Sequence, residues 1–461
     1  TKEGRILGKN VKLTLTSIAT NSSNQVLQIN NKSDKEVFIE TSSQIYPVES
    51  QVMQIASLEK PKLITFDEME LNPGFIVLPS GTDKKEDEID IETKIDLLFD
   101  ANKFKIDSSV DSESREKLKA LLKKYKHVFP GSSNDLGLLP NGFEYIQQFT
   151  VESPPPVKIY NIDNTKRTLI REEILKLVDL GVLEESPEDI ITSNLLVVPK
   201  KDGTRRVVID LRNVNLVTKP SNLQLPNMND IIHKLMGRKY YFSTDVTKAF
   251  WNSTVPIDQR KWYTCLCPIT RQVYQFTRCP MGHRNSAVVF QKLIDKVLRK
   301  LEGDNLQVYI DDIISSENSV SDMLKRIEQL LITLSNHNLR ISLEKSIFFT
   351  TELKCFGFIT DKTGVRPDES RVQKLLEVPL PTSKKDMLSF LASLNFYREH
   401  IPGFSGIASK LYAITGKKAE FIIDGQLRSD LESLKSGLAS SILLNTIDDT
   451  KNDTKLEKDL F

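Results

Sequence analysis

The chain has 461 residues, of which 39% are hydrophobic and 27% are charged, and its formal net charge is +1. These values are typical of a folded globular protein, and the length predicts about two to four domains. No apolar run is long enough to cross a bilayer, so we expect no membrane partner. A near-neutral chain has no global attraction for nucleic acid, so any basic surface must be local.

The four cysteines have no CxxC spacing and no nearby pair of histidines; they are Cys265, Cys267, Cys279 and Cys355. This pattern predicts reduced thiols in an intracellular setting rather than a disulfide framework or a zinc site.

The first part of the chain is predicted to be rich in strands. Apolar residues alternate at Val11, Leu13 and Leu15, so residues 1–82 are expected to form a β-rich segment. A run of mixed charges then opens residues 83–110, which we interpret as a linker.

Residues 111–190 are predicted to carry two amphipathic helices. In the first, apolar residues three and four positions apart share one face: Leu118, Leu121, Leu122 and Tyr125. The second has the same spacing at Ile170, Ile174, Leu177 and Val178, with Gly181 as its expected stop signal.

Two further regions follow. In residues 191–360, short apolar runs alternate with helical stretches, which indicates mixed α and β structure. Residues 361–445 are predicted to be mainly helical, with a capping box from Ser383 to Asp386. Residues 446–461 are expected to be a poorly ordered tail or the truncated start of another domain.

The sequence Tyr309-Ile310-Asp311-Asp312 places two adjacent carboxylates inside an apolar stretch. Like charges this close repel one another, and a divalent cation would relieve the repulsion. Asp245, at the end of a predicted strand, could supply a third carboxylate. Magnesium binds through a few carboxylates plus substrate phosphates, and two such ions about 3.5–4 Å apart support phosphoryl transfer. Taken alone, each Asp is better interpreted as a turn or strand-end residue.

A basic hairpin is predicted between Leu195 and Asp210, with Asp202-Gly203 as its turn. Six basic and two acidic residues lie between Pro199 and Pro220. These cations could neutralise a triphosphate, although a solvated hairpin tip would have the same composition.

Six ordered motifs together resemble the reverse transcriptases of long-terminal-repeat retrotransposons and retroviruses, and the Ty3/gypsy group in particular. They are VPKKDGTRRVVIDLRNVN, FSTDVTKAF, CPMGHRNSAVVFQ, YIDD, LRISLEKS and CFGFITDKTGVRPDESRV. The later segment PLPTSKKDMLSFLASLNFYREHIPGFSGIASKLYAIT resembles the part of that group between polymerase and RNase H. The resemblance covers about residues 115–445.

The resemblance implies an α+β right-hand polymerase with fingers, palm and thumb, followed by the start of a connection region. Residues 111–190 would be lead-in helices and the base of the fingers, 191–360 fingers and palm, and 361–445 thumb and connection. Residues 1–82 would then be an inter-domain segment of a polyprotein, and the tail would be the start of RNase H.

The same resemblance implies roles for single residues. Asp245, Asp311 and Asp312 would be catalytic and would hold two Mg²⁺ ions, or Mn²⁺ in their place, with help from the carbonyl of Val246. The implied nucleotide-binding residues are Lys200, Arg206, Phe250, Met281, Gly282 and Lys345, and the implied primer grip is Phe356, Gly357 and Phe358.

Three of these residues have specific implied tasks. Phe250 would stack under the sugar and exclude a ribose 2′-hydroxyl, although alone it would be taken for a core aromatic. Gly282 would let the backbone approach the template and nucleotide. Lys345 would lie near the leaving pyrophosphate and could act there as a general acid, and a surface salt bridge is an equally good interpretation.

Some positions depart from the family pattern. Asn252-Ser253 stand where Gln-Ile is usual, Met281 where Phe or Gln is usual, and Ser286-Ala287 where Ala-Pro is usual. These departures bear on nucleotide discrimination, which we assign to Phe250 with its neighbours Trp251 and Asn252. No protease, RNase H or integrase motif is recognisable.

The implied activity is RNA-directed DNA polymerisation within a retrotransposon Pol polyprotein. The expected partners are an RNA or DNA template–primer, deoxynucleoside triphosphates, and protease, RNase H and integrase domains in cis. The expected location is the cytoplasm, in a virus-like particle with a nuclear phase. Two alternatives stay open: a catalytically inactive, domesticated or decayed retroelement protein that binds nucleic acid, and an inactive structural subunit of a heterodimer.

Overall fold

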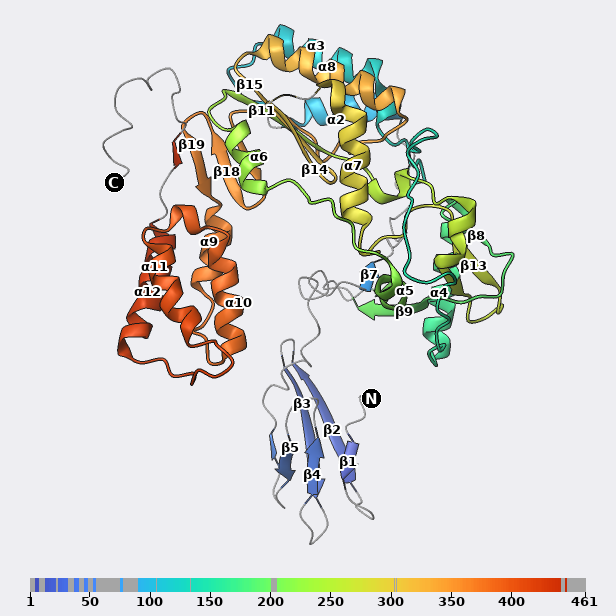
Figure 1. Cartoon of the computed structure of the whole chain (residues 1–461), viewed down its shortest axis with the longest axis vertical. Coiled ribbons are helices and arrows are strands. Elements are labelled where there is room, and N and C mark those ends of the chain that lie inside the picture. The colour runs from blue at the N-terminus through green and yellow to red at the C-terminus, as the bar shows by residue number, and fades with distance from the viewer. Residues whose placement is uncertain are drawn as a thin grey trace. The chain divides into compact units, whose positions relative to one another are not determined.

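The computed structural model describes strands within residues 1–77, then residues 90–440 apart from 105, 133, 200–204, 302 and 304, and a strand at 444–445 (Figure 1). The chain divides into two units, Thr1–Pro73 and Gly74–Phe461, and each is described by itself. None of the described helices is long and apolar enough to cross a membrane.

The N-terminal unit consists of two antiparallel three-stranded sheets, and the predicted β-rich character is confirmed. One sheet has the order β1 (Arg5–Leu7), β4 (Val37–Glu40), β5 (Ile45–Val48), and the other has the order β2 (Leu13–Asn21), β3 (Asn24–Asn31), β6 (Met53–Gln54). The unit ends at Pro73 rather than at the predicted residue 82, because strand β7 (Phe75–Val77) pairs with strand β10 (Arg205–Asp210) of the second unit.

A four-stranded antiparallel sheet forms the centre of the second unit. Its order is β14 (Leu306–Tyr309), β15 (Asp312–Glu317), β11 (Tyr240–Asp245), β16 (Ile347–Thr350). Helices α3 (Ser112–Lys124), α7 (Ser286–Leu298) and α8 (Val320–Asn336) pack on it or on one another (Figure 1).

Helix α8 joins the sheet through an apolar stripe with helical spacing. Its buried residues are Met323, Ile327, Leu330, Leu331 and Leu334. Each fully buried aliphatic side chain of this kind stabilises the fold by about 1.5–3 kcal/mol. Helix α8 therefore anchors the sheet whose strands carry Asp245 and Asp312.

Residues 83–110 were expected to be a linker, and the structure differs. Helix α2 (Ile91–Asp100) lies within them and packs against α3. Ile95 and Phe104 are 0% and 3% exposed, so they belong to the same core as the central sheet. The charge run that directly precedes this helix obscures its apolar spacing in the sequence.

Two small sheets lie in the part of the unit that is predicted to form the fingers. One has the order β7, β10, β9 (Asn194–Pro199). Strands β9 and β10 pair antiparallel, as predicted for the two strands of the basic hairpin. The other has the order β12 (Thr264–Leu266), β13 (Val273–Phe276), β8 (Leu183–Glu185). Helices α4 (Asn164–Asp179) and α5 (Arg212–Val217) complete this part of the unit, whereas α6 (Met228–Leu235) packs against β14 of the central sheet. The predicted turn Asp202-Gly203 lies outside the described residues.

The C-terminal part combines a sheet with a helical bundle. Strands β17 (Glu352–Cys355), β18 (Phe358–Asp361), β19 (Gly364–Pro367) and β20 (Leu444–Asn445) are neighbours in that order. The helices are α9 (Glu369–Leu376), α10 (Lys384–Asn395), α11 (Phe404–Ala413) and α12 (Gly425–Ala439). Ser383 caps α10 by accepting from the amide of Asp386 at 3.1 Å, as the sequence predicted. Residues 446–461 lie outside the described residues.

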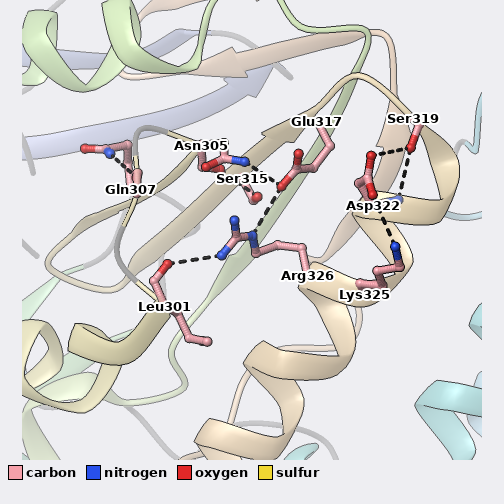
Figure 2. A network of polar contacts seen from close by, with 10 residues as sticks. Leu301, Asn305, Gln307, Ser315, Glu317, Ser319, Asp322, Lys325 and Arg326 are labelled. Carbon is pink, nitrogen blue, oxygen red and sulfur yellow. Dashed lines mark hydrogen bonds and ion pairs between the residues drawn. The ribbon is translucent and has the colours of Figure 1, made fainter.

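A polar network fixes one end of the β14–β15 hairpin (Figure 2). The Glu317 carboxylate accepts from Asn305 Nδ2 at 2.7 Å and from Arg326 Nε at 3.2 Å. Arg326, on α8, also donates to the carbonyl of Leu301 at 3.1 Å. Because Glu317 ends β15 and Asp312 begins it, the opposite end of the hairpin projects from an anchored base.

Candidate active site at the strand ends

The three predicted acids meet at one edge of the central sheet. Asp245 ends β11 and lies directly opposite Asp312, the first residue of β15. The amide of Val246 donates to the carbonyl of Asp311 at 2.7 Å. Opposite residues on antiparallel strands have Cα atoms about 4.5–5.5 Å apart, so residues distant in sequence become near neighbours.

A strained turn presents the two adjacent acids. Tyr309 pairs with Asp312, which leaves Ile310 and Asp311 as a two-residue turn. Ile310 has a φ of +55°, a left-handed conformation that a β-branched residue rarely adopts and that costs about 1–3 kcal/mol. Other groups must therefore hold this turn.

Gln291 of α7 holds it, and the sequence did not single this residue out. Its Oε1 accepts from the amide of Ile310 at 2.6 Å, and its Nε2 donates to the carbonyl of Val308 at 3.2 Å and to Asp295 at 2.7 Å. Gln291 is 3% exposed. The available signal was a polar residue on the otherwise apolar face of an amphipathic helix.

The electrostatics favour a cation at this edge. Burial raises the pKa of Asp311, and the negative charge of Asp245 raises it further. Burial, followed by the charges of Asp311 and Asp245, raises the pKa of Asp312 to about 6. Such shifts indicate carboxylates held together without sufficient positive charge between them.

Lys345 supplies part of that positive charge. Its Nζ lies 2.9 Å from Asp245 Oδ2, although the lysine side chain is 67% exposed. Burial alone would lower the pKa of Lys345, but the hydrogen bond to Asp245 and the nearby carboxylates outweigh it and raise the pKa. Lys345 is therefore a protonated group in direct contact with the acidic centre.

The donor chemistry fits magnesium, since carboxylate oxygens are the ligands that Mg²⁺ prefers. Among the described residues, no group of three or more His, Cys, Asp or Glu side chains is arranged so that it could hold a metal ion, so the three acids do not form a preformed metal site. Asp245, Asp311 and Asp312 would accordingly bind magnesium as an open set, completed by water and substrate phosphates.

Phe250 lies one short turn away from the acids, on the 3₁₀ helix η2 (Ala249–Asn252). Its ring is half-buried and stands edge to face against Phe290, with ring centroids 5.9 Å apart. Trp251 and Asn252 are each 1% exposed, so neither presents a surface to a nucleotide. Any effect of these two neighbours on nucleotide choice must pass through Phe250.

The other predicted nucleotide-binding residues lie on or near strand β10 and in the segment before helix α7. Gly282 has a φ of +72°, and its carbonyl accepts from Asn215 Nδ2 at 3.2 Å. Met281 is partly buried against the core of the fingers. Arg206 lies on β10 opposite Val198. Lys200 lies outside the described residues.

The predicted primer-grip turn is adjacent to the acidic turn. Phe356 and Gly357 both have positive φ, +51° and +89°, and join β17 to β18. The ring of Phe356 meets that of Tyr309 edge to face, with centroids 5.2 Å apart. Tyr397 Oη donates to the carbonyl of Gly357 at 3.3 Å.

Phe358 behaves differently from its two neighbours. It is 2% exposed, and its ring packs against Phe396 and Tyr397 in the core of the helical bundle. The resemblance places all three residues in the hairpin that would grip the primer end; because the ring of Phe358 is enclosed by side chains of the helical bundle, this residue could contribute there only through its backbone. All four cysteines are free, as predicted.

Comparison with known proteins gives the same assignment. The family model "Reverse transcriptase (RNA-dependent DNA polymerase)" matches residues 198–360, which include all three acids. The retrovirus-related Pol polyprotein from transposon 297 of Drosophila melanogaster is 28% identical over 342 residues, which cover 73% of this chain and 32% of that polyprotein. The Pro-Pol polyprotein of simian foamy virus type 3 is 31% identical over 328 residues, covering 70% and 28%.

Among solved structures, the foamy viral protease-reverse transcriptase in complex with dsDNA is similar with a TM-score of 0.67 and 26% identity. The match covers 78% of this chain and 74% of that one. The chain spans about a third of the length of the Pol polyproteins that it matches. The predicted α+β right-hand polymerase fold is confirmed, and residues 198–360 belong to the reverse transcriptase family, with retrovirus-related Pol polyproteins from transposons among the relatives of the chain.

Proposed function

We propose that this chain is an RNA-directed DNA polymerase that extends a primer on an RNA or DNA template. The observation that carries the proposal is the meeting of Asp245, Asp311 and Asp312 at one edge of the central sheet. Two of these carboxylates have raised pKa values, because burial and mutual repulsion disfavour their charge. Divalent cations relieve such repulsion.

The three acids would hold two Mg²⁺ ions, with Mn²⁺ as a substitute and the carbonyl of Val246 as an additional oxygen. When bound, these ions supply charge for activating the primer hydroxyl and for stabilising the leaving pyrophosphate. The protein's own contribution is to hold the carboxylates in place. Gln291 fixes the Ile310 turn, and the anchored β14–β15 hairpin fixes the strands.

The deoxynucleoside triphosphate would lie between the acids and the fingers. Phe250 would limit space at the sugar, Gly282 would allow close backbone approach, and Arg206 with Lys200 would meet the phosphates. Lys345 Nζ, which contacts Asp245, would hold a proton near the leaving pyrophosphate. Catalysis would then consist mainly of positioning and charge stabilisation.

The template–primer would be held through its backbone, as expected for an A-form-like duplex. The foamy viral relative was solved in complex with dsDNA, which supports a duplex as the partner. Relatives that are longer Pol polyproteins support further domains in cis, for which the sequence resemblance implies protease, RNase H and integrase.

Primer extension tests the proposal. We compare the native chain with Asp311→Asn on an RNA template with magnesium, and we expect the variant to lose about a hundredfold or more in rate, because a metal ligand is worth several kcal/mol of transition-state stabilisation. Asp100→Asn, at the exposed end of α2, is the matched control and should extend normally.

Two results would contradict it. Equal extension by the native chain and Asp311→Asn would remove the assignment of the metal site. No extension by a well-folded native chain that still binds template–primer would favour an inactive nucleic-acid-binding protein.

A further inference from the structure

The segment between Asp245 and Phe250 contains a left-handed residue. Lys248 has a φ of +47° and a ψ of 45°. This conformation is unfavourable for an L-residue, so it persists only where neighbouring groups hold it. The carbonyl of Lys248 accepts from the amide of Trp251 at 2.9 Å, which closes the turn that leads into η2.

The side chain of Asn252 holds this turn from inside. Its Nδ2 donates to the carbonyls of Thr247 at 3.1 Å, Lys248 at 3.3 Å and Ala249 at 3.1 Å. These three acceptors fix which way the amide points, because the reverse orientation would bring Oδ1 against three oxygens. Among the described residues, Oδ1 has no donor and is buried. The amide therefore serves the turn alone.

The lead-in segment closes over Asn252 from the other side. The amide of Leu139 donates to the carbonyl of Asn252 at 2.8 Å. A Cβ atom on Gly137 would lie 2.1 Å from Asn252 Oδ1 and 2.8 Å from the carbonyl of Asn338. Only glycine fits here without displacing the amide.

Arg278 ties the same segment to η2. Its Nη1 donates to the carbonyl of Gly137 at 3.0 Å and to that of Trp251 at 2.8 Å. Asn252 is therefore enclosed by the turn that it holds and by a segment that the guanidinium group fastens to that turn.

We propose that Asn252 is a positioning residue for Phe250 and thereby helps to set the preference for deoxynucleotides over ribonucleotides. This rests on the proposed polymerase function and on the place of Phe250 beside the sugar. Asn252 is buried and acts through the backbone: it fixes the three carbonyls that separate Phe250 from the acids. Phe290 supports the ring on its other side. Without the amide, the turn can relax and the ring loses its fixed distance from Asp245.

Single-nucleotide primer extension with deoxynucleoside and ribonucleoside triphosphates tests this inference. We expect Asn252→Ala to reduce the deoxy-over-ribo ratio of kcat/KM by about ten- to a hundredfold, because small displacements near reacting groups have effects of this size. The KM for the deoxynucleotide should rise more than kcat falls, since the acids themselves stay in place.

Two further variants make the result specific. Gly137→Ala keeps the amide but crowds both it and the carbonyl of Asn338 from outside, so the ratio should fall in the same direction. Asn194→Ala is the matched control: Asn194 is another buried amide that bridges backbone, with Nδ2 donating to Lys158 at 3.0 Å and Oδ1 accepting from Tyr160 at 3.1 Å. That variant is expected to lose stability and to keep the native ratio.

The outcomes separate this inference from the proposed function. If the native chain extends primers, Asp311→Asn does not, and Asn252→Ala keeps the native ratio and KM, the inference is wrong and the polymerase stands. If the native chain does not extend primers, both the inference and the proposed polymerase function are wrong. Thermal melts check folding first, and if Asn252→Ala does not fold, an unchanged ratio in Gly137→Ala overturns the inference.

Discussion

At the residue scale, Lys345 is the basic side chain that contacts the acidic centre, and its function has two interpretations. As a proton donor to the leaving pyrophosphate, it would act in the chemical step. As a partner of Asp245 alone, it would be one more exposed ion pair, and such pairs contribute about 0–1 kcal/mol to stability. Its Nζ is 2.9 Å from Asp245 Oδ2, and the pKa of Lys345 is raised, so the proton is present when substrate arrives.

We expect Lys345→Met to lower kcat by about a hundredfold, the usual contribution of a positioned general acid. The KM for the deoxynucleotide should change little, which single-turnover kinetics can establish. Lys345→Arg keeps the charge but cannot release a proton near neutral pH, so it should not restore the rate.

The control outcomes are informative. A native rate in Lys345→Met would leave only the surface ion pair. Full rescue by Lys345→Arg would mean that Lys345 neutralises charge and transfers no proton.

At the scale of elements, the catalytic hairpin depends on a helix that the sequence did not connect with it. Helix α7 supplies Gln291, whose side-chain amide bonds to Ile310 of the turn and to Val308 of strand β14. The left-handed position of the turn is occupied by Ile310 and not by glycine, so the conformation is unfavourable by itself. The turn therefore forms only when helix α7 is packed against it. The active turn is thus stabilised by tertiary structure rather than by its own sequence.

Gln291→Leu tests this dependence. The substitution keeps the size of the side chain but leaves the Ile310 amide and the Val308 carbonyl without their partner, so the free energy of unfolding should fall by about 1–3 kcal/mol. Primer extension should slow more than this loss of stability explains, because the acids shift with the turn. Urea denaturation and extension rates measure the two effects.

Gln329→Leu provides the comparison, since Gln329 is an exposed residue on the neighbouring helix α8. It should change neither stability nor rate. If Gln291→Leu behaves like Gln329→Leu, the turn is held without Gln291.

Local patterns predicted local structure well. The apolar spacing at Leu118 and Leu122 predicted helix α3, and the Ser383 cap was visible as a motif. The acidic site was predictable because two adjacent carboxylates in an apolar stretch repel one another and need a compensating positive charge. The burial of Phe358 could not be predicted from local sequence, because it depends on packing against Phe396 and Tyr397, about forty residues later. Long-range packing of this kind leaves no local periodicity.

At the scale of the whole molecule, positive charge is unevenly distributed. The formal net charge is only +1. A cavity of about 540 Å³ is nevertheless lined by four basic residues and one acidic residue: Lys219, Lys292, Lys296, Arg299 and Glu144. Lys296 is engaged there, since its Nζ donates to the carbonyl of Gly142 at 3.0 Å and lies 4.3 Å from the centre of the Phe143 ring. The remaining cations make this cavity a candidate contact for nucleic-acid phosphate.

Salt dependence of template–primer binding tests that contact. Each phosphate neutralised by Lys or Arg releases counterions, so the logarithm of the affinity falls with the logarithm of salt concentration, and the loss of one contact reduces the slope by about one unit. If Lys292 and Arg299 both meet phosphates, the double variant Lys292→Ala/Arg299→Ala should reduce the slope by about two and weaken binding equally for every sequence. Lys325→Ala, on the exposed face of α8, should leave the slope unchanged. An unchanged salt-dependence slope in the double variant would mean that Lys292 and Arg299 do not contact phosphate and that the duplex binds elsewhere on the molecule.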